Sequence, residues 1–310
     1  MGGRSRPRGL SRLAVVSSYS ISSGFIRVSG SVRYIFSRAA QSIIMSESLS
    51  VLLTNDDGID AVGIQALYQA FDAIADVTVV APTNDQSAVG RQLSSDVTVH
   101  EHDWGYGIDG TPADCVVAGV EVLCPDIDLV IAGCNKGANI GAYVLGRSGT
   151  VSAAVESTFF DVPAMAVSMY IPGGGDTPWH EQATEVSAFA DASRAATYLA
   201  RHAFDAGVFE QADYLNINAP VATDDEPATL EITRPSRVYD MTAEHDGNGT
   251  VTLHDRVWER MRTDDIPDPT GTDRRAVVDG HVSVSPLTAP HTTEHHEALD
   301  ALASTYLDSV

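Results

Sequence analysis

Hydrophobic and polar residues alternate along the chain in blocks that predict strands followed by helices. The runs SVLLT (50–54), VTVVAP (77–82) and DLVIAG (128–133) are almost entirely apolar, as expected for strands buried on both faces. The stretch GIQALYQAF (63–71) carries its apolar residues at helical spacing. Short apolar strands that alternate with helices predict an α/β fold with a Rossmann-like, doubly wound and mostly parallel sheet.

The same alternation continues toward the C-terminus. In GTPADCVVAGVEVL, Thr111 is the expected N-cap and Pro112 the first residue of a helix. PAMAVSM (163–169) and YLNINAP (214–220) predict two more parallel strands, separated by a long helix over about 183–203.

A different pattern begins near residue 228. LEITRPSRVYDM and TVTLHDRVWERM flank the turn-like sequence HDGNG, which predicts an antiparallel hairpin arm over about 228–262. A projecting arm is more useful to a partner subunit than to its own core. We therefore expect a homodimer or a homotetramer built through this C-terminal region.

The charge balance narrows the choice of partners and of environment. The chain has 42 acidic and 19 basic residues, and Lys136 is its only lysine. A phosphate backbone is bound by Lys and Arg, so this acidity argues against a nucleic-acid partner. An acidic, lysine-poor surface is typical of proteins that work in concentrated salt, where charge repulsion is screened. We expect a cytoplasmic protein of a halophile.

Residues 1–44 differ from the rest, since they carry seven arginines and neither Asp nor Glu. They could be a transit peptide, but we favour a start codon placed upstream of the true first residue, Met45. They fall short of the roughly 20 apolar residues that a membrane span needs, so no membrane partner is expected. Residues 45–310 are then one α/β domain that includes the arm.

Two adjacent carboxylates, Asp56 and Asp57, follow the first predicted strand in the sequence TNDDG. Neighbouring like charges repel, which costs free energy unless a cation between them offsets the repulsion. Taken alone, the pair could also cap the next helix. The ends of other strands add Ser87 and Asn135. These four residues offer only oxygen ligands, the set that suits Mg²⁺, Mn²⁺ or Ca²⁺.

The sequence Ser148-Gly149-Thr150 stands where another helix is predicted to begin. Free N–H groups, hydroxyls and the positive end of the helix dipole make an anion site there, whereas the simpler alternative is a Ser N-cap. A divalent ion held by carboxylates and facing an anion site is the arrangement that a phosphate ester requires.

Six motifs follow one another between about residues 50 and 290: TNDDGIDAVGI (54–64), APTNDQSAVGRQLS (81–94), GTPADCV (110–116), AGCNKGANIGAYVLGRSGTVSAAVES (132–157), LNINAP (215–220) and GTDRRAVVDGHVSVSPL (271–287). Together they resemble the SurE (survival protein E) family of 5'-nucleotidases. The resemblance implies a divalent-metal-dependent phosphatase that cleaves nucleoside 5'-monophosphates, often 3'-monophosphates, and in some members polyphosphate. It also implies exchange of C-terminal segments between subunits.

The resemblance also implies roles for individual residues. The implied ligands of one Mg²⁺ or Mn²⁺ ion per subunit are Asp56, Asp57, Ser87 and Asn135. Asn139 and Ser148 match positions associated with phosphate binding and catalysis. We expect Asp56 to orient or deprotonate the attacking water, and Asn139, Ser148, Gly149 and Thr150 to hold the phosphate.

Two other classes of protein remain alternatives. A phosphoacceptor regulatory domain also has an acidic pair after its first strand, but it needs a phosphorylatable Asp where this chain has Asn135. A nucleotide-binding protein without catalytic activity is the second alternative. Release of phosphate from AMP in the presence of Mn²⁺ separates it from an enzyme.

Overall fold

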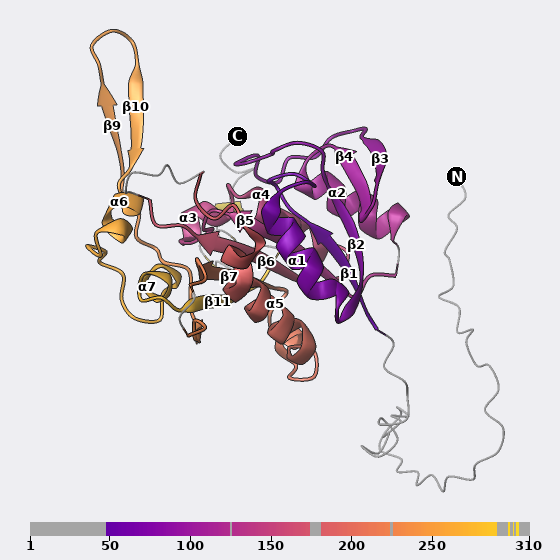
Figure 1. Ribbon diagram of the computed structural model, residues 1–310. Coiled ribbons are helices and arrows are strands. Elements are labelled where there is room, and N and C mark those ends of the chain that lie inside the picture. The colour runs from indigo at the N-terminus through magenta and orange to yellow at the C-terminus, as the bar shows by residue number, and fades with distance from the viewer. Residues whose placement is uncertain are drawn as a thin grey trace, which may run out of the picture. The chain divides into compact units, whose positions relative to one another are not determined.

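The central sheet of the computed structural model has the strand order β3-β4-β2-β1-β5-β6-β7-β11-β8 (Figure 1). The structure describes residues 48–124, 126–173, 181–223 and 226–289, together with residues 297, 300, 302 and 303. The basic segment 1–44 therefore lies outside the described residues. By their contacts, residues Ser48–Val310 form one unit.

The sheet is mostly parallel, as predicted. The mutually parallel strands are β1 (Leu49–Thr54), β2 (Ala75–Pro82), β4 (Gly105–Asp109), β5 (Leu129–Lys136), β6 (Ala164–Tyr170) and β7 (Tyr214–Pro220). The edges are mixed. At one edge β3 (Thr98–His102) is antiparallel to β4, and at the other β11 (Val282–Leu287) is antiparallel to β7, with β8 (Leu230–Ile232) parallel to β11.

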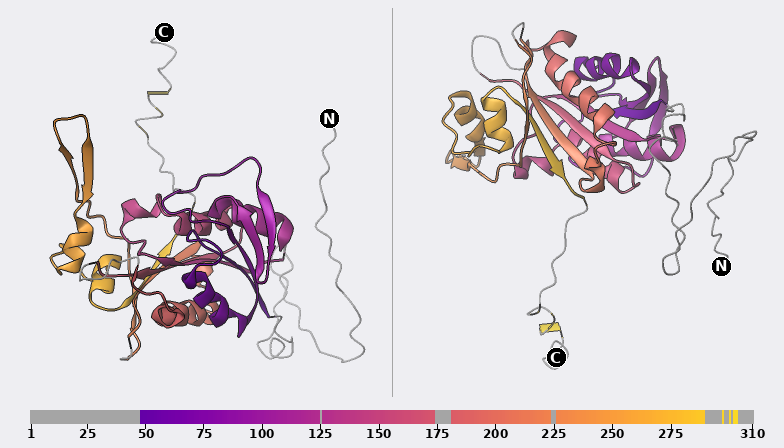
Figure 2. Two further views of the ribbon diagram at one scale, coloured as in Figure 1. Left: turned by 45° about the horizontal axis from the view of Figure 1, so that its top comes forward. Right: turned by 90° about the horizontal axis from the view of Figure 1, so that it is seen from below.

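Helices cover both faces of the sheet (Figure 2). The helices are α1 (Val62–Asp72), α2 (Pro112–Ala118), α3 (Ala142–Leu145), α4 (Gly149–Thr158), α5 (Ala190–His202), α6 (Val257–Arg262) and α7 (Asp273–Val278). Thr111 caps α2 and Pro112 begins it, as the sequence predicts. The predicted helix at 183–203 starts later, with a 3₁₀ turn at Val186–Phe189 before α5. None of the helices in the described ranges is long and apolar enough to cross a membrane.

Two hydrophobic cores, one on each face, explain the unbroken apolar strands. Val51 and Leu53 of β1 are fully buried in the core that contains residues of α1 and α5. Leu52, between them in sequence, is fully buried in the other core with residues of α2 and α4. Successive side chains of a strand point to opposite faces, so a strand covered on both sides favours apolar residues at successive positions.

The C-terminal hairpin is real but shorter than the predicted arm at 228–262. It consists of β9 (Met241–His245) and β10 (Val251–Asp255), which form a separate antiparallel sheet that projects beyond α6 (Figure 1). Leu230–Ile232 instead joins the edge of the central sheet. Residues Val257–Arg262 are helical, because Val257 and Met261 are spaced four apart and bury one face of a helix turn.

One hydrogen bond ties the base of the hairpin to the main unit. The hydroxyl of Tyr143, in α3, donates to Oδ2 of Asp255, the last residue of β10, over 2.5 Å. α3 lies in the connection between β5 and α4. The hairpin is therefore joined to the segment that follows the end of β5.

Gly63 allows α1 to lie close to β5. A Cβ at this position would be 2.0 Å from the carbonyl oxygen of Cys134. In an unhindered helix, replacing Gly by Ala stabilises a protein by about 1 kcal/mol. We expect Gly63→Ala to lower the free energy of unfolding by about 1–3 kcal/mol, as overpacking does, when urea unfolding is measured in molar salt.

Gly146→Ala is the matched control, because nothing lies within 4 Å of an added Cβ at that position. Its free energy of unfolding should stay within about 0.5 kcal/mol of the wild-type value. A Gly63→Ala variant as stable as the wild type would show that α1 does not approach β5 this closely.

Candidate active site

The candidate site lies at the carboxyl ends of the neighbouring strands β1 and β5. The chain continues from β1 to β2 on one side and from β5 to β6 on the other. β1 pairs with β2 on one side and with β5 on the other, so the strand order reverses between β1 and β5. In doubly wound sheets, ligands bind in the crevice outside the carboxyl ends of the strands at such a switch point. Asp56 and Asp57 follow β1 after Asn55, and Asn135 lies at the end of β5.

The carboxylate of Asp56 is buried against the N-terminus of α4. The hydroxyl of Thr150 donates to Oδ1 over 2.6 Å, and the N–H of Thr150 donates to Oδ2 over 3.2 Å. A Cβ at Gly149 would lie 2.8 Å from Oδ2 of Asp56, so a side chain there would displace the carboxylate. The positive end of the α4 dipole adds to the stabilisation of the negative charge.

Both carboxyl groups of the pair have raised pKa values. Burial raises the pKa of Asp56 to about 6, the charge of Asp57 adds to the rise, and the hydrogen bonds from Thr150 oppose it. Burial also raises the pKa of Asp57, and the charge of Asp85 adds to it. The N–H of Lys136 donates to Oδ2 of Asp57 over 2.9 Å, which acts in the opposite direction. The site thus gathers negative charge that its protein surroundings only partly balance.

The helix-capping alternative for the acidic pair is wrong. α1 begins at Val62, its N-cap is Ala61, and no side chain caps it. Gly58 instead lets the chain turn after β1, since it has a φ of 100°, which L side chains rarely adopt. Ile59 then donates its N–H to the carbonyl of Pro82 at the end of β2 over 2.8 Å.

The loop after β2 brings Ser87 toward the acidic pair. The N–H of Gln86 donates to the carbonyl of Asp56 over 2.7 Å. Oδ1 of Asp85 accepts both the N–H of Ser87 over 2.8 Å and its hydroxyl over 2.6 Å. Because the Ser87 hydroxyl donates its hydrogen bond to Asp85, the lone pairs of the hydroxyl oxygen stay available to a ligand. Sequence reasoning missed Asp85, although its spacing two residues before Ser87 was a usable signal.

Asn135 is positioned by an irregularity in β5. The register between β5 and β6 shifts between Ala132 and Asn135, and such bulges often re-aim a side chain near a site. The Nδ2 group of Asn135 donates to the carbonyl of Gly137 over 2.6 Å. Its amide oxygen is therefore the atom left to act as a ligand.

Asn139 is buried and fixed by polar residues of two strands. Its Nδ2 donates to the hydroxyl of Ser168 over 2.9 Å, and its N–H donates to Oδ1 of Asn218 over 2.8 Å. The Nδ2 of Asn216 donates to the carbonyl of Asn139 over 2.8 Å. Sequence reasoning gave these partners no role. The signal was in LNINAP, where Asn216 and Asn218 place two amides on the same face of a buried strand.

Ser148 is the N-cap of α4, and its hydroxyl oxygen accepts the N–H of Val151 over 3.0 Å. The anion at the start of this helix is the Asp56 carboxylate, which engages both donors of Thr150. That differs from the expectation that Thr150 holds a phosphate. The sequence places a helix N-terminus at Ser148–Thr150 but does not reveal that an acidic side chain from the loop after β1 fills it.

The donor set fits a hard divalent cation. Among the described residues, no three or more His, Cys, Asp or Glu side chains gather as a metal site. The predicted ligands, Asp56, Asp57, Ser87 and Asn135, combine two carboxylates with a hydroxyl and an amide oxygen. Beside them Oδ1 of Asn55 is buried without a hydrogen-bond partner in the described part of the chain. Oxygen donors alone are what Mg²⁺, Mn²⁺ and Ca²⁺ prefer.

Fold and site together define a doubly wound α/β protein with an acidic site at its switch point. The chain belongs to the Survival protein SurE family, whose model matches residues 51–241. It is 94% identical over 266 residues to a Haloquadratum walsbyi protein named 5'-nucleotidase SurE, which covers 86% of this chain and 100% of that protein. A Haloarcula marismortui protein of the same name is 66% identical over 257 residues, or 83% of this chain and 95% of that one.

A solved structure, the SurE protein from Aquifex aeolicus, has a similar fold. The TM-score is 0.64 at 29% sequence identity, and the match covers 84% of this chain and 99% of that chain.

The hydroxyl of Thr150 gives a direct test of the site geometry. Thr150→Val keeps the shape but removes a donor from a buried carboxylate, which should lower the free energy of unfolding by about 1–3 kcal/mol. Thr150→Ser keeps the hydroxyl and loses one methyl group, worth about 1 kcal/mol. Urea unfolding in molar salt should therefore rank wild type, Ser and Val in this order. A Ser variant less stable than the Val variant would contradict the bond to Asp56.

Proposed function

We propose that the chain is a divalent-metal-dependent 5'-nucleotidase that hydrolyses nucleoside 5'-monophosphates to nucleoside and phosphate. The observation that carries the proposal is the acidic pair at the β1–β5 switch point, in which Asp56 is held against the start of α4 and Asp57 against the end of β5. The name 5'-nucleotidase SurE of relatives that match most of this chain supports the same activity. Nucleoside 3'-monophosphates and polyphosphate are further proposed substrates.

One Mg²⁺ or Mn²⁺ ion per subunit is the proposed cofactor. Its ligands are Asp56, Asp57, Ser87 and Asn135. When bound, the ion would polarise a phosphoryl oxygen and so favour attack at phosphorus.

The chain's own residues supply positioning and proton transfer. Asp56 orients or deprotonates the attacking water. Thr150 holds the Asp56 carboxylate in place, in preference to the phosphate role expected from the sequence. Asn139, Ser148 and the N–H of Gly149 hold phosphate oxygens as charge moves in the transition state.

The acidic composition supports a cytoplasmic location in a salt-loving cell. With 42 acidic and 19 basic residues, the surface favours a small nucleotide bound by a metal ion over a nucleic acid.

Asp57→Asn tests the metal assignment. The change removes a ligand charge, so the affinity for Mn²⁺ should fall by at least about tenfold, together with phosphate release from AMP. Calorimetric titration with Mn²⁺ and a phosphate-release assay in molar salt measure the two effects. Full activity with unchanged Mn²⁺ affinity would refute the metal role of Asp57.

Ser148→Ala tests the separation between metal and phosphate binding. Its hydroxyl is assigned to phosphate, so turnover of AMP should fall by about 10²-fold while Mn²⁺ affinity stays near the wild-type value. The lost N-cap should also lower stability by about 1 kcal/mol, which a urea titration reports separately. A parallel loss of Mn²⁺ affinity would place Ser148 among the metal ligands.

The proposed assembly is a homodimer, or a homotetramer of such dimers, made through the β9–β10 hairpin. A two-stranded hairpin alone is at best marginally stable in water, and Leu253 is 68% exposed. Leu253→Asp should therefore lower the mass found by sedimentation in molar salt. Tyr198→Asp, on α5, is the control, since Tyr198 is similarly exposed at 57%. A wild-type protein that sediments only as a monomer would refute the assembly.

A further inference from the structure

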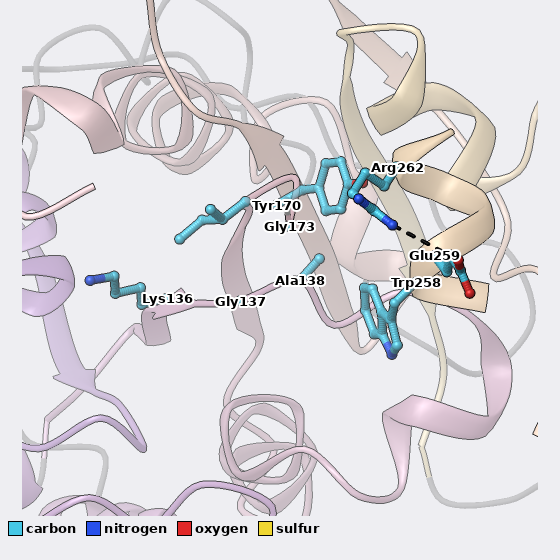
Figure 3. A pocket seen from close by; sticks show the side chains of 9 residues that line it. Lys136, Gly137, Ala138, Tyr170, Gly173, Trp258, Glu259 and Arg262 are labelled. Atoms are coloured by element: carbon cyan, nitrogen blue, oxygen red, sulfur yellow. Dashed lines mark ion pairs between the residues drawn. The ribbon is translucent and has the colours of Figure 1, made fainter. Parts of the chain in front are cut away.

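A cavity of about 570 Å³ opens beside the candidate active site. Lys136 and Gly137 line it at one side, directly after the predicted ligand Asn135, and α6 lines it at the other side (Figure 3). Binding sites for small molecules commonly enclose roughly 300–1,000 Å³, so the cavity has the volume of a ligand site.

The walls of the cavity are mainly apolar and aromatic. Tyr170, at the end of β6, is buried, and Ile171 and Ala138 add aliphatic surface. Trp258, in α6, is 37% exposed although it is among the largest apolar side chains of the molecule. Figure 3 shows its indole on the α6 side of the cavity, with Ala138 between it and the ring of Tyr170.

Polar groups stand at the same end of the cavity as the indole. Glu259 and Arg262, also in α6, line the cavity, and Oε1 of Glu259 lies 3.9 Å from a guanidinium nitrogen of Arg262. A carboxylate accepts hydrogen bonds and a guanidinium donates them. The pair can therefore meet both kinds of group on the edge of a planar heterocycle.

The cavity and the acidic pair share one residue, Lys136. The backbone N–H of Lys136 holds the carboxylate of Asp57 over 2.9 Å, and Lys136 is also part of the cavity wall. A molecule with its phosphate at the acidic pair can thus extend into the cavity without leaving the surface of this chain.

We infer that this cavity binds the nucleoside part of the substrate, and that Trp258 stacks on the nucleobase. The inference rests on the proposed function and adds to it a specificity-determining residue. Every nucleobase has an apolar, polarisable face, and stacking on an aromatic side chain is a main source of affinity for bases. The partial exposure of Trp258 leaves a face of the indole open for such a contact.

Steady-state kinetics of the full chain with AMP test the inference. In Trp258→Ala the KM for AMP should rise by about tenfold, the loss expected for one base–aromatic stack, while kcat stays near the wild-type value. Inhibition by inorganic phosphate, which has no base, should be unchanged. Trp258→Phe keeps an aromatic ring and should restore most of the affinity for AMP.

Tyr198→Ala is the control for loss of an exposed aromatic side chain away from the cavity, and its KM should equal that of the wild type. An unchanged KM for AMP in Trp258→Ala, or a parallel weakening of phosphate inhibition, would overturn the base subsite.

Failure of the proposed function gives a different result. A wild-type protein that releases no phosphate from AMP would refute the nucleotidase but would not decide the base subsite. Calorimetric titration with adenosine decides it in that case. Tighter binding to the wild type than to Trp258→Ala supports the subsite, and equal binding or none overturns it.

Discussion

The hydrogen bonds between Thr150 and the buried Asp56 carboxylate are the interaction on which the rest of the site depends. A buried carboxylate is unfavourable unless hydrogen bonds or a nearby charge stabilise it. Thr150 supplies two donors, and Gly149 leaves the space that the carboxylate occupies. The segment that follows β1 and the start of α4 therefore hold each other in position, which helps to preorganise the proposed phosphatase site.

A second set of buried polar contacts fixes the connection between β5 and α4. Asn139 is bonded to Ser168 on β6 and to two asparagines on β7. Further along, Oδ2 of Asp273 accepts the N–H of Gly141 over 2.6 Å. Buried polar groups that are well satisfied rigidify a structure, whereas each unsatisfied one would be costly. This explains why a segment with so little regular structure can place Asn139 and Ser148 reproducibly.

Much of the fold could be predicted because its signals are local. Apolar runs such as 50–54 and 128–133 predicted buried parallel strands, and these in turn predicted a site at their carboxyl ends. Leu230–Ile232 was misassigned to the hairpin because three residues carry too little pattern to identify a pairing partner.

The site was predictable in its residue types and less so in its contacts. Asp56 and Asp57 stood out as neighbouring charges, but Thr150 meets Asp56 across 94 positions of sequence. No local pattern records such a pairing. The same holds for the bonds from Asn216 and Asn218 to Asn139, which join residues 77 and 79 positions apart.

The hydrogen bond from Tyr143 to Asp255 links the hairpin, the proposed subunit contact, to the segment that carries proposed active-site residues. It joins the base of the hairpin to α3, in the same connection that carries Asn139 and Ser148. Any coupling free energy that passes through it acts equally in both directions. If the proposed subunit contact changes nucleotide affinity through this bond, nucleotide binding must change the affinity of the subunit contact by the same factor, and ligand affinity would then depend on protein concentration.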